Sequence, residues 1–310
     1  MRLHDYQSEF RNLISLTAEK LQIPESAVER DYYIVLLLQR LEKSEYADKC
    51  VFKGGTSLSK CYPGSIERFS EDIDLTFLGM DLSDNICEKN IKRIEKIMSF
   101  GAKTHKIIEE RYPRSKSMYV WFENERNKVK LEIGSSVRPD PYSKKTFKSY
   151  IHEFLEELKE DEDIKKYNLA PVTLNVLNVE RTFIDKVMSV KRHAICGNLD
   201  KKVRHIYDVV RLFMMNEIKN FLQNKEELKR IIQATKKTDS YYLLKREVTK
   251  EYNPDEAYDF PRWKEKLTLP IKSRYEKLHE DLLYTNEKQN FDDVLSTFER
   301  ISEIFAEIGE

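Results

Sequence analysis

Glycine, proline and cysteine are scarce in this sequence of 310 residues. With 8 glycines and 9 prolines, a loop-rich all-β fold is disfavoured and long polar helices are favoured. The 4 cysteines include no C-x-x-C pair, so neither a zinc motif nor a redox motif is supported. The longest apolar run, Ile34–Leu38, is far shorter than the roughly 20 residues of a membrane helix, and Met1–Phe10 is too polar for a signal peptide. We therefore expect a soluble, cytoplasmic protein with no membrane partner.

An excess of charge of either sign is also missing, because 54 Lys and Arg balance 54 Asp and Glu. A basic field over the whole protein is thereby excluded, but local patches are not. Residues 101–150 hold 12 basic against 6 acidic side chains, whereas residues 251–310 hold 8 against 15. This segregation permits a basic face for an anionic ligand.

Hydrophobic periodicity predicts an α+β protein whose strands lie in the first part of the chain. Helices are predicted over residues 6–21, from a capping box at Ser26 and Glu29 to about residue 43, over 85–100 and over 151–167. Strands are predicted over residues 50–52, 73–77 and 172–176, with a hairpin formed by 117–122 and 128–133.

The pattern is helical from Glu180 to the end, with interruptions at residues 197–198, 253–254 and 270. We therefore expect a mixed-sheet domain over residues 1–178 and a helical domain over residues 179–310. Aromatic residues of the second domain are candidates for base stacking, but packing between helices is the favoured interpretation; they are Tyr241, Tyr242, Tyr252, Tyr258 and Trp263.

A candidate phosphate-binding turn follows the first predicted strand. Gly54 and Gly55 allow the backbone to turn tightly and to approach a ligand closely. Thr56 and Ser57 then stand at the start of a helix, where free N–H groups and the helix dipole favour an anion. The segment is not a Walker A loop, because G-x-x-x-x-G-K-[ST] is absent, and Gly-Gly alone is more often a simple turn.

A pair of carboxylates, Asp72 and Asp74, lies on the second predicted strand, about 17 residues further on. Because side chains alternate along a strand, both carboxylates project from one face while Ile73 and Leu75 point into the core. Adjacent carboxylates repel each other unless a cation neutralises them, and hard oxygen ligands suit Mg²⁺ bound together with nucleotide phosphates. Asp-x-Asp alone is common; together with Gly-Gly, in this order, it is much more specific.

These two motifs carry a resemblance to a known family. The segments Phe52-Lys-Gly-Gly-Thr-Ser-Leu58 and Arg68-Phe-Ser-Glu-Asp-Ile-Asp-Leu75 resemble those of the AbiEii-type nucleotidyltransferase toxins, in the DNA polymerase β-like superfamily. The segment Val28–Tyr33 resembles the helix that precedes the first motif in such proteins. The resemblance implies a polymerase β-like fold, a mixed sheet flanked by helices, followed by a helical domain.

The resemblance also implies a third carboxylate on a later strand, which is Glu132 in Val129-Lys-Leu-Glu-Ile133. Val129, Leu131 and Ile133 alternate with Lys130 and Glu132, so Glu132 belongs to a polar face. The superfamily often has Asp here. The alternative is that Glu132 is an ion-pair residue between strands.

Two later segments extend the resemblance over roughly residues 20–215. Glu180–Lys186 resembles the helix that carries an active-site lysine, which makes Lys186 a phosphate contact; a lysine at such a position is otherwise usually solvated. In Arg204-His-Ile-Tyr-Asp208 the resemblance makes Asp208 an active-site residue that holds Lys186 or another basic residue. The alternative is a ladder of ion pairs within the helix formed by Arg204, Asp208 and Arg211.

The function implied is transfer of a nucleoside monophosphate from an NTP to a hydroxyl group, with release of pyrophosphate. Asp72, Asp74 and Glu132 would hold Mg²⁺, or Mn²⁺ in its place. The nucleotide contacts would come from the turn, the hydroxyl of Ser70 and two cations; they are Gly54, Gly55, Thr56, Ser57, Ser70, Lys186 and Arg204.

The family resemblance further implies an RNA acceptor such as the 3′ end of tRNA, a bacterial toxin or abortive-infection role, and a separately encoded antitoxin. Two alternatives remain open from the sequence. One is a nucleotidyltransferase that modifies a protein or a small molecule such as an aminoglycoside. The other is a catalytically inactive nucleotide-binding protein.

Overall fold

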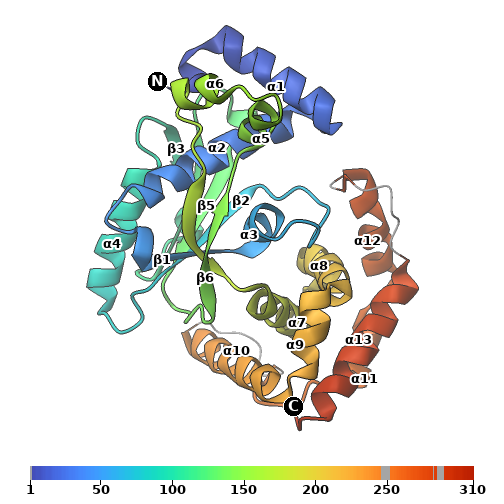
Figure 1. Ribbon diagram of the computed structural model, residues 1–310. Coiled ribbons are helices and arrows are strands. Elements are labelled where there is room, and N and C mark those ends of the chain that lie inside the picture. The colour runs from blue at the N-terminus through green and yellow to red at the C-terminus, as the bar shows by residue number, and fades with distance from the viewer. Residues whose placement is uncertain (1, 246–251, 282, 285–289) are drawn as a thin grey trace. The chain divides into compact units, whose positions relative to one another are not determined.

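The computed structural model describes residues 2–245, 252–281, 283–284 and 290–310, and the chain divides into two compact units (Figure 1). Unit 1 comprises Met1–Cys61 and Phe69–Leu177, and unit 2 comprises Tyr62–Arg68 and Asn178–Glu310. Among the described helices, none is both long and apolar enough to cross a membrane.

Unit 1 is built on a mixed sheet, which confirms the predicted α+β class. Within the described residues, seven strands pair in the order β3-β4-β5-β2-β1-β7-β6. The pairs β1–β7 and β2–β5 are parallel and the other neighbours are antiparallel. The strands are β1 (Cys50–Lys53), β2 (Asp72–Phe77), β3 (Lys103–Lys106), β4 (Ser115–Trp121), β5 (Val129–Gly134), β6 (Tyr142–Phe147) and β7 (Val172–Leu177).

The predicted strands and the β4–β5 hairpin are confirmed, whereas β3 and β6 were not predicted. Both unpredicted strands form the edges of the sheet, and neither shows alternation of apolar and polar residues. All four residues of β3 are exposed. An edge strand of this kind lacks the periodic signal that identifies a half-buried strand.

Alternation along the inner strands gives the sheet one apolar and one polar face. Ile73 and Leu75 of β2 and Leu131 of β5 are fully buried, and helices α2 (Glu25–Glu42) and α4 (Asp84–Met98) pack against the sheet. Side chains at alternate positions, among them Asp72 and Asp74, point to the opposite face. The sheet therefore presents the candidate carboxylates on its polar face.

The other helices of unit 1 are α1 (Gln7–Leu21), α3 (Gly54–Cys61), α5 (Tyr150–Glu157) and α6 (Asp161–Lys166). The capping box predicted at Ser26 and Glu29 is wrong: α2 begins at Glu25 after Pro24, whose extended backbone forms the N-cap, and Ser26 lies inside the helix. The single helix predicted over 151–167 is also wrong. Lys159 adopts a left-handed conformation with φ of 63° and separates α5 from α6.

Unit 2 is helical, with α7 (Val179–Ile195), α8 (Val203–Met214), α9 (Asn216–Gln223), α10 (Lys225–Lys245), α11 (Phe260–Trp263), α12 (Leu269–Asp281) and α13 (Phe291–Ala306) (Figure 1). The interruption predicted at 197–198 follows α7, where Gly197 has φ of 71°. Tyr252, Tyr258 and Trp263 are buried, which confirms packing rather than base stacking. The side chains of Tyr241 and Tyr242 lie outside the described residues.

Candidate active site

The Gly-Gly turn of unit 1 lies directly against one of the candidate carboxylates. Helix α3 begins at Gly54, immediately after β1 ends, and Gly54 has φ of +86°. A Cβ atom placed on Gly54 would stand 2.1 Å from Oδ2 of Asp74. Only glycine fits here, both for its backbone conformation and for the close approach of the carboxylate. The structure thus brings together two motifs that lie 20 residues apart.

The hydroxyls of the turn are used to hold the motifs together. The Thr56 hydroxyl donates to the carbonyl of Asp72, and its oxygen lies at hydrogen-bond distance, 3.0 Å, from Ser70 Oγ. The buried Ser57 hydroxyl donates to the carbonyl of Gly54 at 2.9 Å. These side chains therefore fix the shape of the turn. The first backbone N–H groups of α3 have no acceptor within the helix itself, and such a helix start favours an anion.

The three candidate carboxylates occupy neighbouring positions on the polar face. In the parallel pair β2–β5, Asp74 is in register with Glu132 and Asp72 with Lys130. The Glu132 carboxylate is paired with Lys130 on its own strand, and Lys130 also pairs with Glu110 Oε2 at 2.9 Å. The alternative interpretation of Glu132 was an ion pair between strands. The residue does make an ion pair, but with Lys130 on its own strand.

A metal site is not assembled by these side chains as they stand. Among the described residues, no three His, Cys, Asp or Glu side chains converge on one point. The backbone register nevertheless places three hard oxygen donors on one face, which is the donor chemistry that Mg²⁺ requires. The set Asp72, Asp74 and Glu132 therefore stays a prediction, and it needs Glu132 to leave Lys130.

Helix α2 makes ion pairs with both motif segments of unit 1, the Gly-Gly turn with its helix and the Asp-x-Asp strand. Asp31 pairs with Lys60 of α3 at 2.8 Å, with both side chains buried, and also accepts the N–H of Tyr150 at 2.7 Å. Arg30 pairs with Glu71, the residue before Asp72. The segment Val28–Tyr33, singled out in the sequence, therefore has a positioning role within unit 1.

Unit 2 contains a buried cluster of two cations and one carboxylate. Arg68 donates from Nε to Asp208 Oδ1 at 2.6 Å and from Nη2 to Asp208 Oδ2 at 2.7 Å. Lys186 Nζ lies 2.8 Å from Asp208 Oδ2. Burial acts to raise the pKa of Asp208, but the charges of Arg68 and Lys186 outweigh it and lower the pKa to about 2. The cluster therefore keeps one net positive charge.

The contact expected between Lys186 and Asp208 is present, and the solvated alternative for Lys186 is wrong because the residue is 5% exposed. The ladder alternative is also wrong. Arg204 is exposed, while Arg211 pairs with Glu67 at 2.7 Å rather than with Asp208. The catalytic roles of Lys186, Asp208 and Arg204 stay predictions.

Two histidines next to the cluster are neutral. His205 Nδ1 lies 3.1 Å from the Ser189 hydroxyl, and burial, followed by the charge of Lys186, lowers the pKa of His205 well below its usual value. Burial likewise lowers the pKa of His193 to about 4. The positive charge of the cluster thus comes from Arg68 and Lys186.

Sequence reasoning missed Arg68, although the residue begins the quoted motif Arg68-Phe-Ser-Glu-Asp72. Its partner Asp208 is 140 residues away, and no local pattern indicates that pairing.

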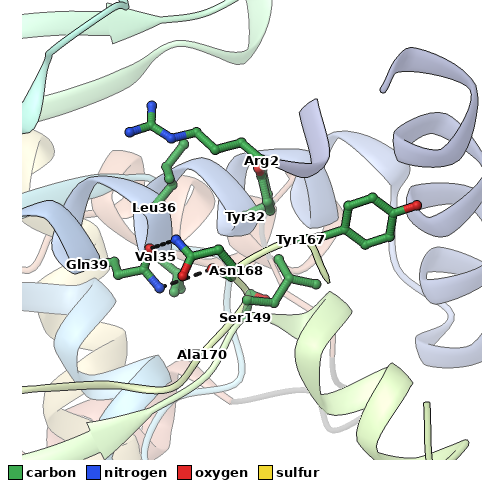
Figure 2. Close-up of a pocket in the computed structure, with 10 residues that line it drawn as sticks. Arg2, Tyr32, Val35, Leu36, Gln39, Ser149, Tyr167, Asn168 and Ala170 are labelled. Atoms are coloured by element: carbon green, nitrogen blue, oxygen red, sulfur yellow. Dashed lines mark hydrogen bonds between the residues drawn. The ribbon is translucent and has the colours of Figure 1, made fainter. Parts of the chain in front are cut away.

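A pocket elsewhere in unit 1 is unrelated to these residues (Figure 2). It is lined mainly by residues of α2 and of the segment 167–170. Its polar groups satisfy one another: Gln39 donates to the carbonyl of Asn168, and Asn168 donates to the side-chain oxygen of Gln39 (Figure 2). Its lining includes none of the candidate site residues.

Comparison with known proteins defines the class. A family model described as "Nucleotidyl transferase AbiEii toxin, Type IV TA system" matches residues 36–297, so the chain is an enzyme of the nucleotidyltransferase class. The chain belongs to the AbiEii nucleotidyltransferase toxin family. A comparison with curated proteins finds no match.

A solved structure, that of MenT4, agrees with this fold. The nucleotidyltransferase toxin MenT4 of Mycobacterium tuberculosis has a similar fold, with 17% identity and a TM-score of 0.50, over 96% of this chain and 99% of that chain. JHP933 from Helicobacter pylori matches with 18% identity and a TM-score of 0.39, over 83% of this chain and 95% of that chain. The MenT4 likeness supports the predicted mixed-sheet architecture.

Proposed function

We propose that this enzyme transfers a nucleoside monophosphate from an NTP to a hydroxyl of an RNA, with the 3′ end of tRNA as the acceptor. The observation that carries the proposal is the juxtaposition of Gly54 and Asp74 at the start of α3. It sets an anion-binding helix start beside carboxylates that suit a divalent cation. A triphosphate bound with its metal ion needs both the anion-binding helix start and the carboxylates.

Binding of the NTP is assigned to the turn. The N–H groups of Gly54, Gly55 and the following residues bind the β- and γ-phosphates, while Thr56 and Ser57 hold the turn in shape. Ser70, tied to Thr56, contacts the nucleotide beside Asp72. Asp72, Asp74 and Glu132 would hold Mg²⁺, which would neutralise phosphate charge and lower the pKa of the attacking hydroxyl.

The reaction forms one bond and breaks one. The acceptor hydroxyl oxygen bonds to the α-phosphorus, the bond from that phosphorus to the β-phosphate oxygen breaks, and pyrophosphate leaves. The hydroxyl proton passes to a carboxylate of the polar face. Lys186 and Arg204 of unit 2 offset the charge of the leaving pyrophosphate, and Asp208 positions Lys186. Only three residues separate Arg68, the other partner of Asp208, from Asp72 in the chain.

The biological role proposed is that of a toxin acting in the cytoplasm, opposed by a separately encoded antitoxin. The description of the matching family as a type IV toxin–antitoxin system supports this role. RNA is proposed as the acceptor because the segment 101–150 holds 12 basic against 6 acidic residues, and those of its basic side chains that no carboxylate neutralises suit a phosphate backbone.

Label transfer tests the function. Purified protein is mixed with Mg²⁺, bulk tRNA and each α-labelled NTP in turn, with and without EDTA, beside a variant carrying Asp72→Ala and Asp74→Ala. We expect label on RNA from at least one NTP, lost with EDTA and in the variant. No label from any NTP would contradict the RNA proposal, and label on an added protein or aminoglycoside instead would replace it.

Gly54 offers a sharper test of the juxtaposition. Gly54→Ala is expected to reduce transfer at least tenfold, because its Cβ displaces the Asp74 carboxylate, in addition to a backbone cost of about 1–2 kcal/mol. The matched control is Gly101→Ala in the same unit, where φ is +72° and a Cβ meets no atom of the described residues within 4 Å. Equal transfer rates for the two variants would show that the contact with Asp74 is unimportant.

A further inference from the structure

The polar face of the sheet continues well beyond the carboxylates. Across the strands β2, β5, β4 and β3, four residues stand in register: Asp72, Lys130, Tyr119 and His105. Residues in register share a face, so Tyr119 and His105 lie on the carboxylate side of the sheet. Strands are about 4.8 Å apart, which puts the Tyr119 backbone about 10 Å from that of Asp72.

Aromatic side chains and lysines alternate on this extension. Trp121 lies two residues beyond Tyr119 on β4 and is in register with Lys103 of β3. Tyr119 and Trp121 are only half-buried, and Lys103 is exposed. The Lys128 ammonium stands 4.5 Å from the centre of the Tyr119 ring and also pairs with the exposed Glu125 at 3.5 Å, a pair that a phosphate can replace. We call the set Lys103, His105, Tyr119, Trp121 and Lys128 the β3–β4 platform.

Several basic residues of the segment 101–150 are already neutralised by ion pairs within unit 1. Arg111, Arg114 and Lys116 pair with the α4 residues Glu95, Asp84 and Glu88, at 2.7, 2.5 and 3.0 Å.

The lysines of β3 differ from these three. Within the described residues, the side chains of Lys103, His105 and Lys106 have no hydrogen-bond or ion-pair partner. Lys103 and Lys106 therefore place unneutralised positive charge at the β3 edge, next to two half-exposed aromatic rings. This edge is complementary to an anionic chain.

We propose that the β3–β4 platform binds the single-stranded end of the RNA acceptor and leads its terminal hydroxyl toward Asp72 and Asp74. The inference rests on the proposed transfer to RNA. Bases stack on Tyr119 and Trp121, while Lys103 and Lys128 contact phosphates, which is the combination that single-stranded nucleic acids require. A spacing of about 10 Å is that of one or two nucleotides from the stacked base to the reacting end.

Binding of RNA without NTP tests the platform separately from catalysis. The probe is a short fluorescent single-stranded RNA, and its affinity is measured by anisotropy. We expect Tyr119→Leu and Trp121→Leu each to weaken binding about tenfold, while Tyr119→Phe, which keeps the ring, binds as the unchanged protein does. Circular dichroism establishes that each variant is folded.

Lys103 provides a second test on an exposed side chain, where folding is not at risk. Lys103→Gln is expected to weaken RNA binding. It should also reduce the slope of log affinity against log salt concentration by about one. Lys106→Gln, on the same exposed strand but the opposite face, is the matched control and is expected to leave both unchanged.

The outcomes separate the two proposals. Unchanged RNA affinity in the aromatic variants, or equal effects of Lys103→Gln and Lys106→Gln, overturns the platform even if label transfer succeeds. Equally strong binding of a fully double-stranded RNA also overturns it, because paired bases cannot stack on the rings. Weakened binding in the variants supports the platform, and label transfer in the same preparation decides the proposed function independently.

Discussion

Replacing Asp74 with asparagine is expected to lower the rate of nucleotidyl transfer by about a thousandfold. Asn has nearly the same size, so the contact with Gly54 persists, but the negative charge that suits a divalent cation is lost. Because the same metal is proposed to stabilise the charge of the reacting phosphates, the loss should fall mainly on kcat. The measurement is the initial rate of label transfer at saturating NTP and RNA.

The matched control for this experiment is Asp81→Asn. Asp81 is in the same unit, its side chain is 88% exposed, and its partner is the exposed Arg138. We expect this change to leave the rate within about twofold, since exposed ion pairs contribute little. If Asp74→Asn transferred label as fast as Asp81→Asn, the carboxylate would have no part in catalysis.

Replacing Asp208 with alanine is expected to destabilise the protein by about 3–5 kcal/mol. The change leaves Arg68 and Lys186 buried with no counter-charge; these residues are 3% and 5% exposed. Urea denaturation measures the loss. Asp200→Ala in the same unit removes an exposed pair with Arg274 and should cost less than about 1 kcal/mol.

The sign of the pH dependence follows from the lowered pKa of Asp208. The carboxyl group has a pKa of about 2 in the folded chain against an ordinary value of 3.8. Its contribution of about 2 kcal/mol is therefore complete above pH 3.8 and is lost as the pH falls through about 2. The free energy of unfolding of Asp208→Ala should lack this acid-sensitive contribution.

A triple variant carrying Arg68→Met, Lys186→Met and Asp208→Leu should recover stability, since no charge remains buried in the cluster. A single Asp208→Ala variant as stable as Asp200→Ala would contradict this account.

The inner part of the sheet could be predicted from the sequence. Strands β1, β2, β5 and β7 carry alternating or continuous apolar residues, because at least one face of each is buried in the core. The edge strands β3 and β6 bury little, so no pattern distinguished them from loops. The β3 part of the platform was missed for the same reason, although β4 was predicted.

The candidate site shows a similar division. The Gly54 turn and the shared face of Asp72 and Asp74 follow from local geometry, and the structure places them as the motifs indicate. The pairing of Asp208 with Lys186 was expected only from the family resemblance, and the pairing with Arg68 was not expected at all. Spacing along α8 suggested Arg204 and Arg211 as partners of Asp208. In the structure Asp208 instead makes a bidentate contact with Arg68 and an ion pair with Lys186. Long-range pairing is decided by tertiary packing, which local spacing does not encode.

The excursion of Tyr62–Arg68 into unit 2 makes the two units inseparable by a single cut. The chain leaves unit 1 after Cys61 and returns at Phe69, three residues before Asp72. A fragment ending at Leu177 would keep Arg68 and lose Asp208, while a fragment starting at Asn178 would do the reverse. Neither unit is thus a self-contained module that recombination could exchange intact. The carboxylate motif and the helical unit must be inherited together.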